Sequence, residues 1–213
     1  FFLYQTWCFD WYYAGFHYPF VPLAQLQISL DKPNVHMVSP IYHLPQLGDY
    51  THFNSEGSKW FGGYCGLANK KVMIDNQDWK PIHLTDYSVV GNVIYLKFYA
   101  QQYPLVFDSV NVVNRGVSKS FQIRNATDFN QNSFLDIITN VQIVRPDTIK
   151  ITCSQNPAGK KLTYAINATG NTNMSSGNLR DSATDVFNFP IVENRADVEH
   201  KLYNWCPLFE QIL

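Results

Sequence analysis

The pattern of hydrophobic residues changes once along the chain, near residue 76, and this change constrains the fold more than any other feature. Before it, short apolar runs alternate with stretches in which apolar residues recur at helical spacing, which is typical of strand–helix–strand units. After it, helical periodicity disappears, and β-branched and aromatic runs alternate with Gly, Asn, Asp and Pro. The sequence therefore predicts an α/β domain over residues 1–75 and an all-β domain over residues 76–213, with the boundary near 76–85.

The first domain has a clear expected order of elements. Residues 1–6 form a short apolar run that predicts a buried strand of a parallel sheet, and residues 35–38 predict a second strand. Between the two strands, Pro22 suits the first position of a helix, and leucines follow it at helical spacing. Residues 31–34 are expected to end this helix.

A polar loop after the second strand carries the residues that point to chemistry. Asp49 and His52 lie three positions apart in it. One tight turn at this spacing brings the carboxylate to the Nδ1–H of the imidazole, which fixes the tautomer and leaves Nε2 able to take a proton from a nucleophile. Asn54 or Ser55 can cap the helix that follows, and Glu56 suits its first turn. Because functional residues of parallel sheets follow the carboxyl ends of strands, this position favours a catalytic pair.

The second domain is expected to be a β-sandwich or a jelly-roll-like domain, because about seven short apolar runs follow one another between turn residues. Residues 167–185 are rich in Asn, Ser, Thr and Gly and predict a long polar loop. The strands are expected at residues 89–100, 105–107, 110–113, 121–123, 134–144, 148–152 and 162–166.

Composition limits the classes of function. A net charge of −1 gives no electrostatic reason to expect a nucleic acid or an anionic membrane as partner. No apolar run reaches the roughly 18 residues that cross a bilayer. The low charged content of 15% suits either a large apolar interior or a subunit of an assembly, so a homo-oligomer stays open. Buried free thiols are expected rather than disulfides or metal sites, because the cysteines are widely spaced, at Cys8, Cys65, Cys153 and Cys206.

Residues 48–57, Gly-Asp-Tyr-Thr-His-Phe-Asn-Ser-Glu-Gly, resemble a block near the end of the catalytic domain of SGNH (GDSL-type) hydrolases. In that family a D-x-x-H block is followed by a short polar step, a glycine and a helix, and the strand at residues 34–38 is similar to the family's preceding strand. The resemblance implies the C-terminal portion of a three-layer, flavodoxin-like α/β fold. It also implies that His52 is the general base and Asp49 its orienting acid, with no cofactor and no metal.

A looser resemblance covers the second domain. Residues 177–182, Gly-Asn-Leu-Arg-Asp-Ser, and the pair Asn204-Trp205 are similar to esterases with an appended β domain, including phage tail proteins that deacetylate surface glycans. This implies a serine esterase that acts on an acylated glycan or polysaccharide, in an extracellular or virion-associated location. The competing class is a catalytically silent structural or glycan-binding module of a virion tail or a cell-surface assembly.

The sequence departs from the SGNH pattern at the nucleophile. No Gly-Asp-Ser block precedes Asp49, so the serine and the oxyanion-hole residues are expected on a missing N-terminal segment, and the chain is expected to be the C-terminal portion of a longer protein. Ser182 is an alternative nucleophile, although a loop of a β domain lacks the sharp turn that exposes such a serine. A metal site formed by His43, Asp49 and His52 is a second alternative, because two imidazoles and a carboxylate are a common ligand set.

Overall fold

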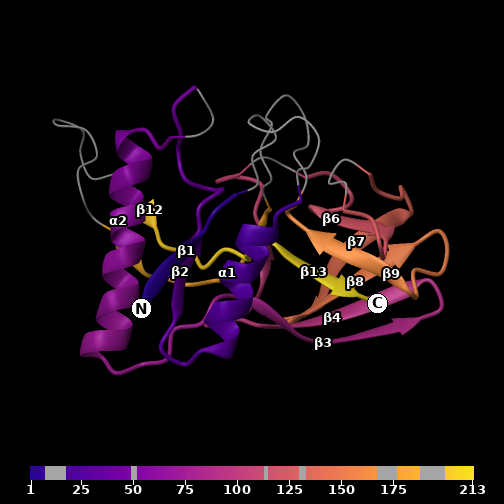
Figure 1. Cartoon of the computed structure of the whole chain (residues 1–213), viewed down its shortest axis with the longest axis horizontal. Coiled ribbons are helices and arrows are strands. Elements are labelled where there is room, and N and C mark those ends of the chain that lie inside the picture. The colour runs from indigo at the N-terminus through magenta and orange to yellow at the C-terminus, as the bar shows by residue number, and fades with distance from the viewer. Residues whose placement is uncertain (8–17, 49–51, 113–114, 130–132, 167–176, 188–199) are drawn as a thin grey trace.

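The computed structural model describes residues 1–7, 18–48, 52–112, 115–129, 133–166, 177–187 and 200–213. These residues form a mixed α/β structure with few helices and mostly antiparallel sheets. The helices lie at one end of the molecule and the larger antiparallel sheets at the other (Figure 1). The predicted mixture of an α/β part and a β-rich part is confirmed at this level.

The N-terminal part is a strand–helix–strand unit made of β1 (Phe2–Gln5), α1 (Phe20–Asp31) and β2 (His36–Pro40). β1 and β2 pair in parallel, as the apolar runs predict. The helix begins two residues before Pro22, which therefore lies inside the first turn rather than at its first position. A proline is tolerated there because the N–H groups of a first turn have no partner within the helix.

The second helix, α2 (Ser55–Asn69), begins where the sequence predicts it. Asn54 is the cap, because its side-chain oxygen accepts a hydrogen bond from the Gly57 N–H at 2.8 Å. The helix continues into a short π-helical segment, η1 (Lys70–Ile74). Within α2, the apolar side chains of Tyr64 and Ala68 are fully buried.

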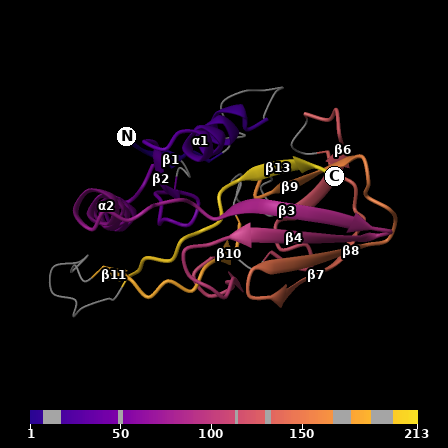
Figure 2. The same ribbon diagram turned by 90° about the horizontal axis from the view of Figure 1, so that it is seen from below.

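The β-rich part contains two larger antiparallel sheets, whose strands Figure 2 shows from below. Aromatic rings from the two sheets meet, since Phe98 lies edge-on to Phe209 with centroids 5.8 Å apart. The four-stranded sheet has the order β3 (His83–Val90), β4 (Val93–Tyr99), β8 (Thr148–Cys153) and β7 (Ile138–Arg145). The three-stranded sheet has the order β13 (Phe209–Ile212), β9 (Lys160–Tyr164) and β6 (Phe121–Asn125).

Two pairs of short strands complete the described part. β5 (Val106–Phe107) pairs with β10 (Leu179–Arg180), and β11 (Val186–Phe187) pairs with β12 (His200–Lys201). β10 lies within the predicted polar loop at residues 167–185, so that prediction is wrong at residues 179–180. Each strand of these pairs has only two residues, which is too short for an apolar pattern to reveal.

Two other strand predictions need correction. The run at residues 89–100 is divided by a two-residue turn, in which Gly91 has a φ of +60°, so it spans parts of β3 and β4. A tight turn that contains glycine at positive φ reverses the chain between antiparallel strands. The expected strand at residues 110–113 is absent over residues 110–112, because the Asp108 carboxylate accepts the N–H groups of Val110 and Asn111 and bends the chain there.

Residues 200–206, named here the crossing segment, begin beside the α/β part and lead towards β13 in the β-rich part. The hydroxyl of Tyr42 donates to the carbonyl oxygen of Cys206, and that of Tyr64 donates to the carbonyl oxygen of Tyr203, both at 2.9 Å. β12 accordingly lies beside the α/β part in Figure 1, whereas β13 lies in the three-stranded sheet. One continuous cluster of buried side chains therefore extends through both parts, and the boundary near residues 76–85 stays a prediction.

Three cysteines lie in the described part, and all three are free thiols. Cys153 and Cys206 are buried, as expected, Cys65 is half-buried, and Cys8 lies outside the described residues. Of the helices in the described ranges, none combines the length and the apolar character needed to cross a membrane.

Candidate active site

The loop that joins β2 to α2 is closed at its base by backbone contacts. The N–H of Leu47 donates to the carbonyl oxygen of His52 at 2.8 Å, and Gln46 and Phe53 form an antiparallel bridge. These two contacts bring the chain at Leu47 next to the chain at His52, beyond the carboxyl end of β2. His52 lies where this loop meets the start of α2, and its side chain is exposed.

Asp49, the other member of the predicted pair, lies outside the described residues. Its contact with the His52 imidazole therefore stays a prediction. The described residues nevertheless give His52 two properties that a general base needs, which are exposure to a substrate and a backbone held in place by a hydrogen bond.

Gly57 fixes the approach of the helix to the loop. A Cβ atom built on Gly57 would lie 2.0 Å from the carbonyl oxygen of Pro45, so only glycine permits the first turn of α2 to lie this close to the loop backbone. The N–H of Asn54 also donates to this Pro45 oxygen, at 3.3 Å. The glycine of the D-x-x-H block therefore has a packing role, which holds the loop against the helix.

Buried aromatic side chains support the N-terminal half of the loop. The ring of His43 stacks on Trp205 of the crossing segment, with centroids 5.0 Å apart, and meets Tyr64 of α2 edge-on at 5.2 Å. His43 is 8% exposed, and neither ring nitrogen has a hydrogen-bond partner within the described residues. Burial lowers the pKa of His43 to about 3, because the charged imidazolium loses its hydration there. His43 is therefore a neutral core residue.

This position of His43 bears on the metal alternative. The His43 ring is enclosed by aromatic rings, whereas the His52 side chain is exposed. The described ranges also contain no group of three His, Cys, Asp or Glu side chains suited to hold a metal ion. A site that combines His43 with His52 has no support in this arrangement.

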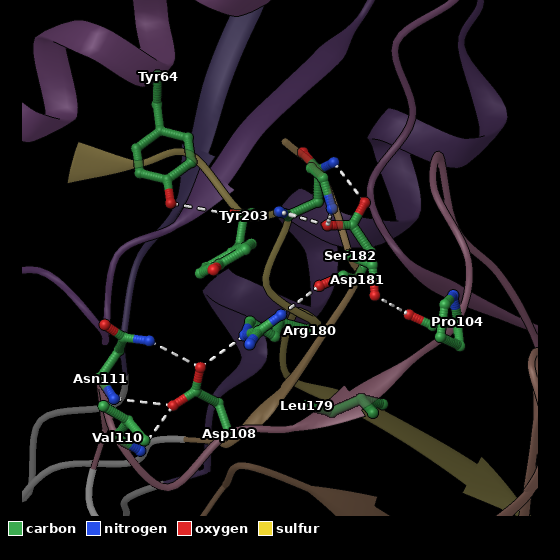
Figure 3. Close-up of polar contacts among 12 residues, drawn as sticks. Tyr64, Pro104, Asp108, Val110, Asn111, Leu179, Arg180, Asp181, Ser182 and Tyr203 are labelled. Carbon is green, nitrogen blue, oxygen red and sulfur yellow. Dashed lines mark hydrogen bonds and ion pairs between the residues drawn. The ribbon is translucent and has the colours of Figure 1, made fainter. Parts of the chain in front are cut away.

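A second polar cluster lies between β10 and the crossing segment (Figure 3). The Arg180 Nε donates to an Asp108 carboxylate oxygen at 2.5 Å, and the Arg180 guanidinium lies 3.7 Å from the centroid of the Tyr203 ring. Burial opposes the ionisation of Asp108, but hydrogen bonds from Arg180, Asn111 and Val110 outweigh it and lower the pKa of Asp108 to about 2. The pair is partly buried, and the contact of Arg180 with Tyr203 connects it to the crossing segment.

Asp181 and Ser182 extend this cluster and are also engaged in structural contacts (Figure 3). The Asp181 carboxylate accepts hydrogen bonds from the backbone and the side chain of Asn204, at 3.0 and 2.7 Å, and burial raises its pKa. The Ser182 hydroxyl donates to the carbonyl oxygen of Pro104 at 2.6 Å. Because this hydroxyl is committed to a backbone carbonyl rather than to a histidine, Ser182 has no support as the nucleophile.

The sequence reasoning missed Asp108 and the crossing segment. Asp108 and Arg180 are separated by 72 positions, so no local pattern connects them. The one signal in the sequence is the run Asp108-Ser109-Val110-Asn111, because an Asp side chain often accepts the backbone N–H groups two or three positions later in a turn. Comparison of the chain with protein-family models, with curated proteins and with solved structures gives no match.

Proposed function

We propose that the chain is the C-terminal portion of a serine esterase, with His52 as general base and Asp49 as its orienting acid. The proposed fold is a three-layer, flavodoxin-like SGNH fold followed by a β-sandwich or jelly-roll-like domain. One observation carries the proposal. It is the order β1, α1, β2 and capped α2, with an exposed His52 between the carboxyl end of β2 and the start of α2.

The proposed reaction is acyl transfer. His52 Nε2 takes the proton of a serine hydroxyl as its oxygen attacks the ester carbonyl, and then gives the proton to the departing alkoxide. The same nitrogen activates the water that releases the acyl group from the serine. Asp49 holds the imidazole in the required tautomer and stabilises the imidazolium. The proposed substrate is an acylated glycan, for example an O-acetylated polysaccharide.

The arrangement of β1 supports a serine on a separate segment. Among the described residues β2 is the one strand that pairs with β1, and parallel sheets are normally covered on both faces. Phe1 is 81% exposed, and Tyr4, Phe20 and Val21 are also exposed on β1 and α1. Further parallel strands beside β1 would cover this apolar surface and place a loop with a serine at the same edge as His52.

Hydrolysis of p-nitrophenyl acetate by the complete protein tests the base. His52→Ala is expected to lower kcat/KM by about 10²–10⁴-fold, since that is the usual contribution of general acid–base catalysis. His83→Ala is the matched control, because the His83 ring lies on β3 against the carbonyl oxygen of Pro81. Unfolding curves of both variants establish that they fold. Equal turnover by wild type and His52→Ala would overturn the assignment.

Labelling with a fluorophosphonate tests where the nucleophile lies. The complete protein is expected to be labelled at one serine outside residues 1–213, and His52→Ala is expected to suppress the labelling. A labelled serine within residues 1–213 would contradict its placement on a separate segment while keeping the acyl-transfer mechanism. Absence of both labelling and turnover would favour the second candidate, a catalytically silent structural or glycan-binding module. A groove on the four-stranded sheet, lined by Lys97, Arg145 and Lys150 among others, supports glycan binding.

A further inference from the structure

The four-stranded sheet buries one face and exposes the other. Along β4 the side chains of Ile94, Leu96 and Phe98 are buried, whereas Tyr95 and Lys97 between them are exposed. This alternation is typical of an antiparallel sheet with one face in water. The exposed face belongs to the end of the molecule away from α2 (Figures 1 and 2).

A groove of about 580 Å³ lies on this exposed face. Its size falls within the usual range of about 300–1,000 Å³ for sites that bind small molecules. Side chains of three adjacent strands, β4, β8 and β7, line it. They are Tyr95, Lys97, Gln142, Val144, Arg145, Thr148 and Lys150.

The strand register places the polar groups of the groove in two neighbouring rows. In one row Lys150 lies between Tyr95 and Gln142. In the next row Thr148 lies between Lys97 and Arg145. Neighbouring strands are about 4.8 Å apart, and successive rows on one face are about 7 Å apart. One sugar ring and its substituents are large enough to contact both rows.

The groove has an excess of positive charge in a chain whose net charge is −1. Lys97 has two carboxylates nearby, since its Nζ lies 3.9 Å from Asp147 and Asp86 is opposite it in the register. Within the described ranges Arg145 and Lys150 form no ion pair. Arg145 and Lys150 are therefore available to bind an anionic ligand, whose charge is complementary to theirs.

We propose that this groove binds an acidic oligosaccharide, with a sugar carboxylate between Arg145 and Lys150 and a sugar ring on the face of Tyr95. Gln142 and Thr148 supply hydrogen bonds to sugar hydroxyls. Sugar rings are neutral away from their carboxylates, so one aromatic ring with few cations suits a glycan. A nucleic acid would need a longer run of cations to contact successive phosphates. The groove is separate from the His52 loop, and its proposal does not rest on the esterase activity.

Binding to matched polymers tests the proposal. The probes are polygalacturonate, alginate and hyaluronan, each compared with its carboxyl-reduced form, which keeps the linkage and loses the charge. We expect at least one acidic polymer to bind at least tenfold more tightly than its reduced form in isothermal titration calorimetry. Equal binding of the members of every pair, or no binding to any acidic polymer, would overturn the proposal. Tighter binding of single-stranded DNA would also overturn it and would favour a nucleic-acid partner.

Substitutions then locate the binding to the groove. The double variant Arg145→Gln, Lys150→Gln is expected to weaken binding of the acidic polymer at least tenfold. The single variant Tyr95→Ala is also expected to weaken binding, whereas Tyr95→Phe keeps the ring and should keep the affinity. The control Lys32→Gln removes an exposed lysine beyond the end of α1 and should leave the affinity unchanged. Equal weakening by the control and by the double variant would show attraction without a site, which refutes the proposal.

Discussion

The buried neutral state of His43 predicts that acid destabilises the protein through this one side chain. Its pKa falls from the ordinary 6.5 to about 3 in the folded state because of burial. The unfolded chain therefore binds a proton at His43 between these two values, whereas the folded chain does not. The stability that depends on neutral His43 is fully present above pH 6.5 and is lost progressively as the pH falls towards 3.

The magnitude follows from the two pKa values. Each pH unit below the ordinary pKa lowers the free energy of unfolding by about 1.4 kcal/mol. Between pH 7.5 and pH 5 the loss due to His43 is about 2 kcal/mol, which for a chain of this length lowers Tm by about 4–8 °C. The variant His43→Phe keeps a ring against Trp205 and removes the proton-binding site. Because neither ring nitrogen has a hydrogen-bond partner among the residues that the structure describes, the substitution should change stability at pH 7.5 by less than about 1.5 kcal/mol.

Urea unfolding followed by tryptophan fluorescence at pH 7.5 and pH 5 measures this difference. The wild type should lose about 2 kcal/mol more than His43→Phe between the two pH values. Tyr64→Phe is the matched control, because it removes the hydrogen bond to the Tyr203 carbonyl oxygen and keeps His43. It should lower stability by about 1 kcal/mol at both pH values. If the wild type and His43→Phe lose the same amount on acidification, the reasoning about His43 is wrong.

The remaining predictions concern Gly57 and Gly62 of α2 and the ion pair between Asp108 and Arg180. Gly57→Ala should lower the free energy of unfolding by about 1–3 kcal/mol, because its Cβ atom would meet the Pro45 carbonyl oxygen. Gly62→Ala is the control, because a Cβ atom built on Gly62 meets open space, and it should raise the free energy of unfolding by about 0.5–1 kcal/mol. Equal effects of the two substitutions in urea unfolding would contradict the close contact between Gly57 and Pro45. Asp108→Asn should cost about 2 kcal/mol at pH 7, since it leaves the partly buried Arg180 without its anion. Because the pKa of Asp108 is about 2 in the folded state, the stability difference between wild type and Asp108→Asn should shrink as the pH falls from about 4 to 2. If urea unfolding shows the same difference at both pH values, the charge of Asp108 does not stabilise the protein.

The α/β part could be predicted well from the sequence because its signals are local. The apolar runs predicted β1 and β2, and Asn54 was one of the two residues predicted to cap α2, which begins at Ser55. A cap and a helical face depend on side chains within about four positions of one another. The interpretation of Asp49 and His52 rests on the same kind of short spacing.

The β-rich part and the contacts around the loop could not be predicted in this way. β10 has two residues and gains its partner β5 only through the fold. Nothing near Arg180 in the sequence indicates Asp108, and nothing near Tyr42 indicates Cys206, which lies 164 positions away. Pairing between distant segments is decided by the packing of the whole chain, which no short pattern contains.

The sequence by itself determined the order of the elements in the α/β part and the presence of a carboxylate and an imidazole three positions apart in a loop. The tertiary structure decided which histidine is exposed and which is buried. His43 and His52 have the same chemistry, but the crossing segment covers His43 with Trp205 and leaves the His52 side chain exposed. The physical reason is that burial removes the water that a charged imidazolium needs, and the burial of His43 comes from side chains that are distant in sequence.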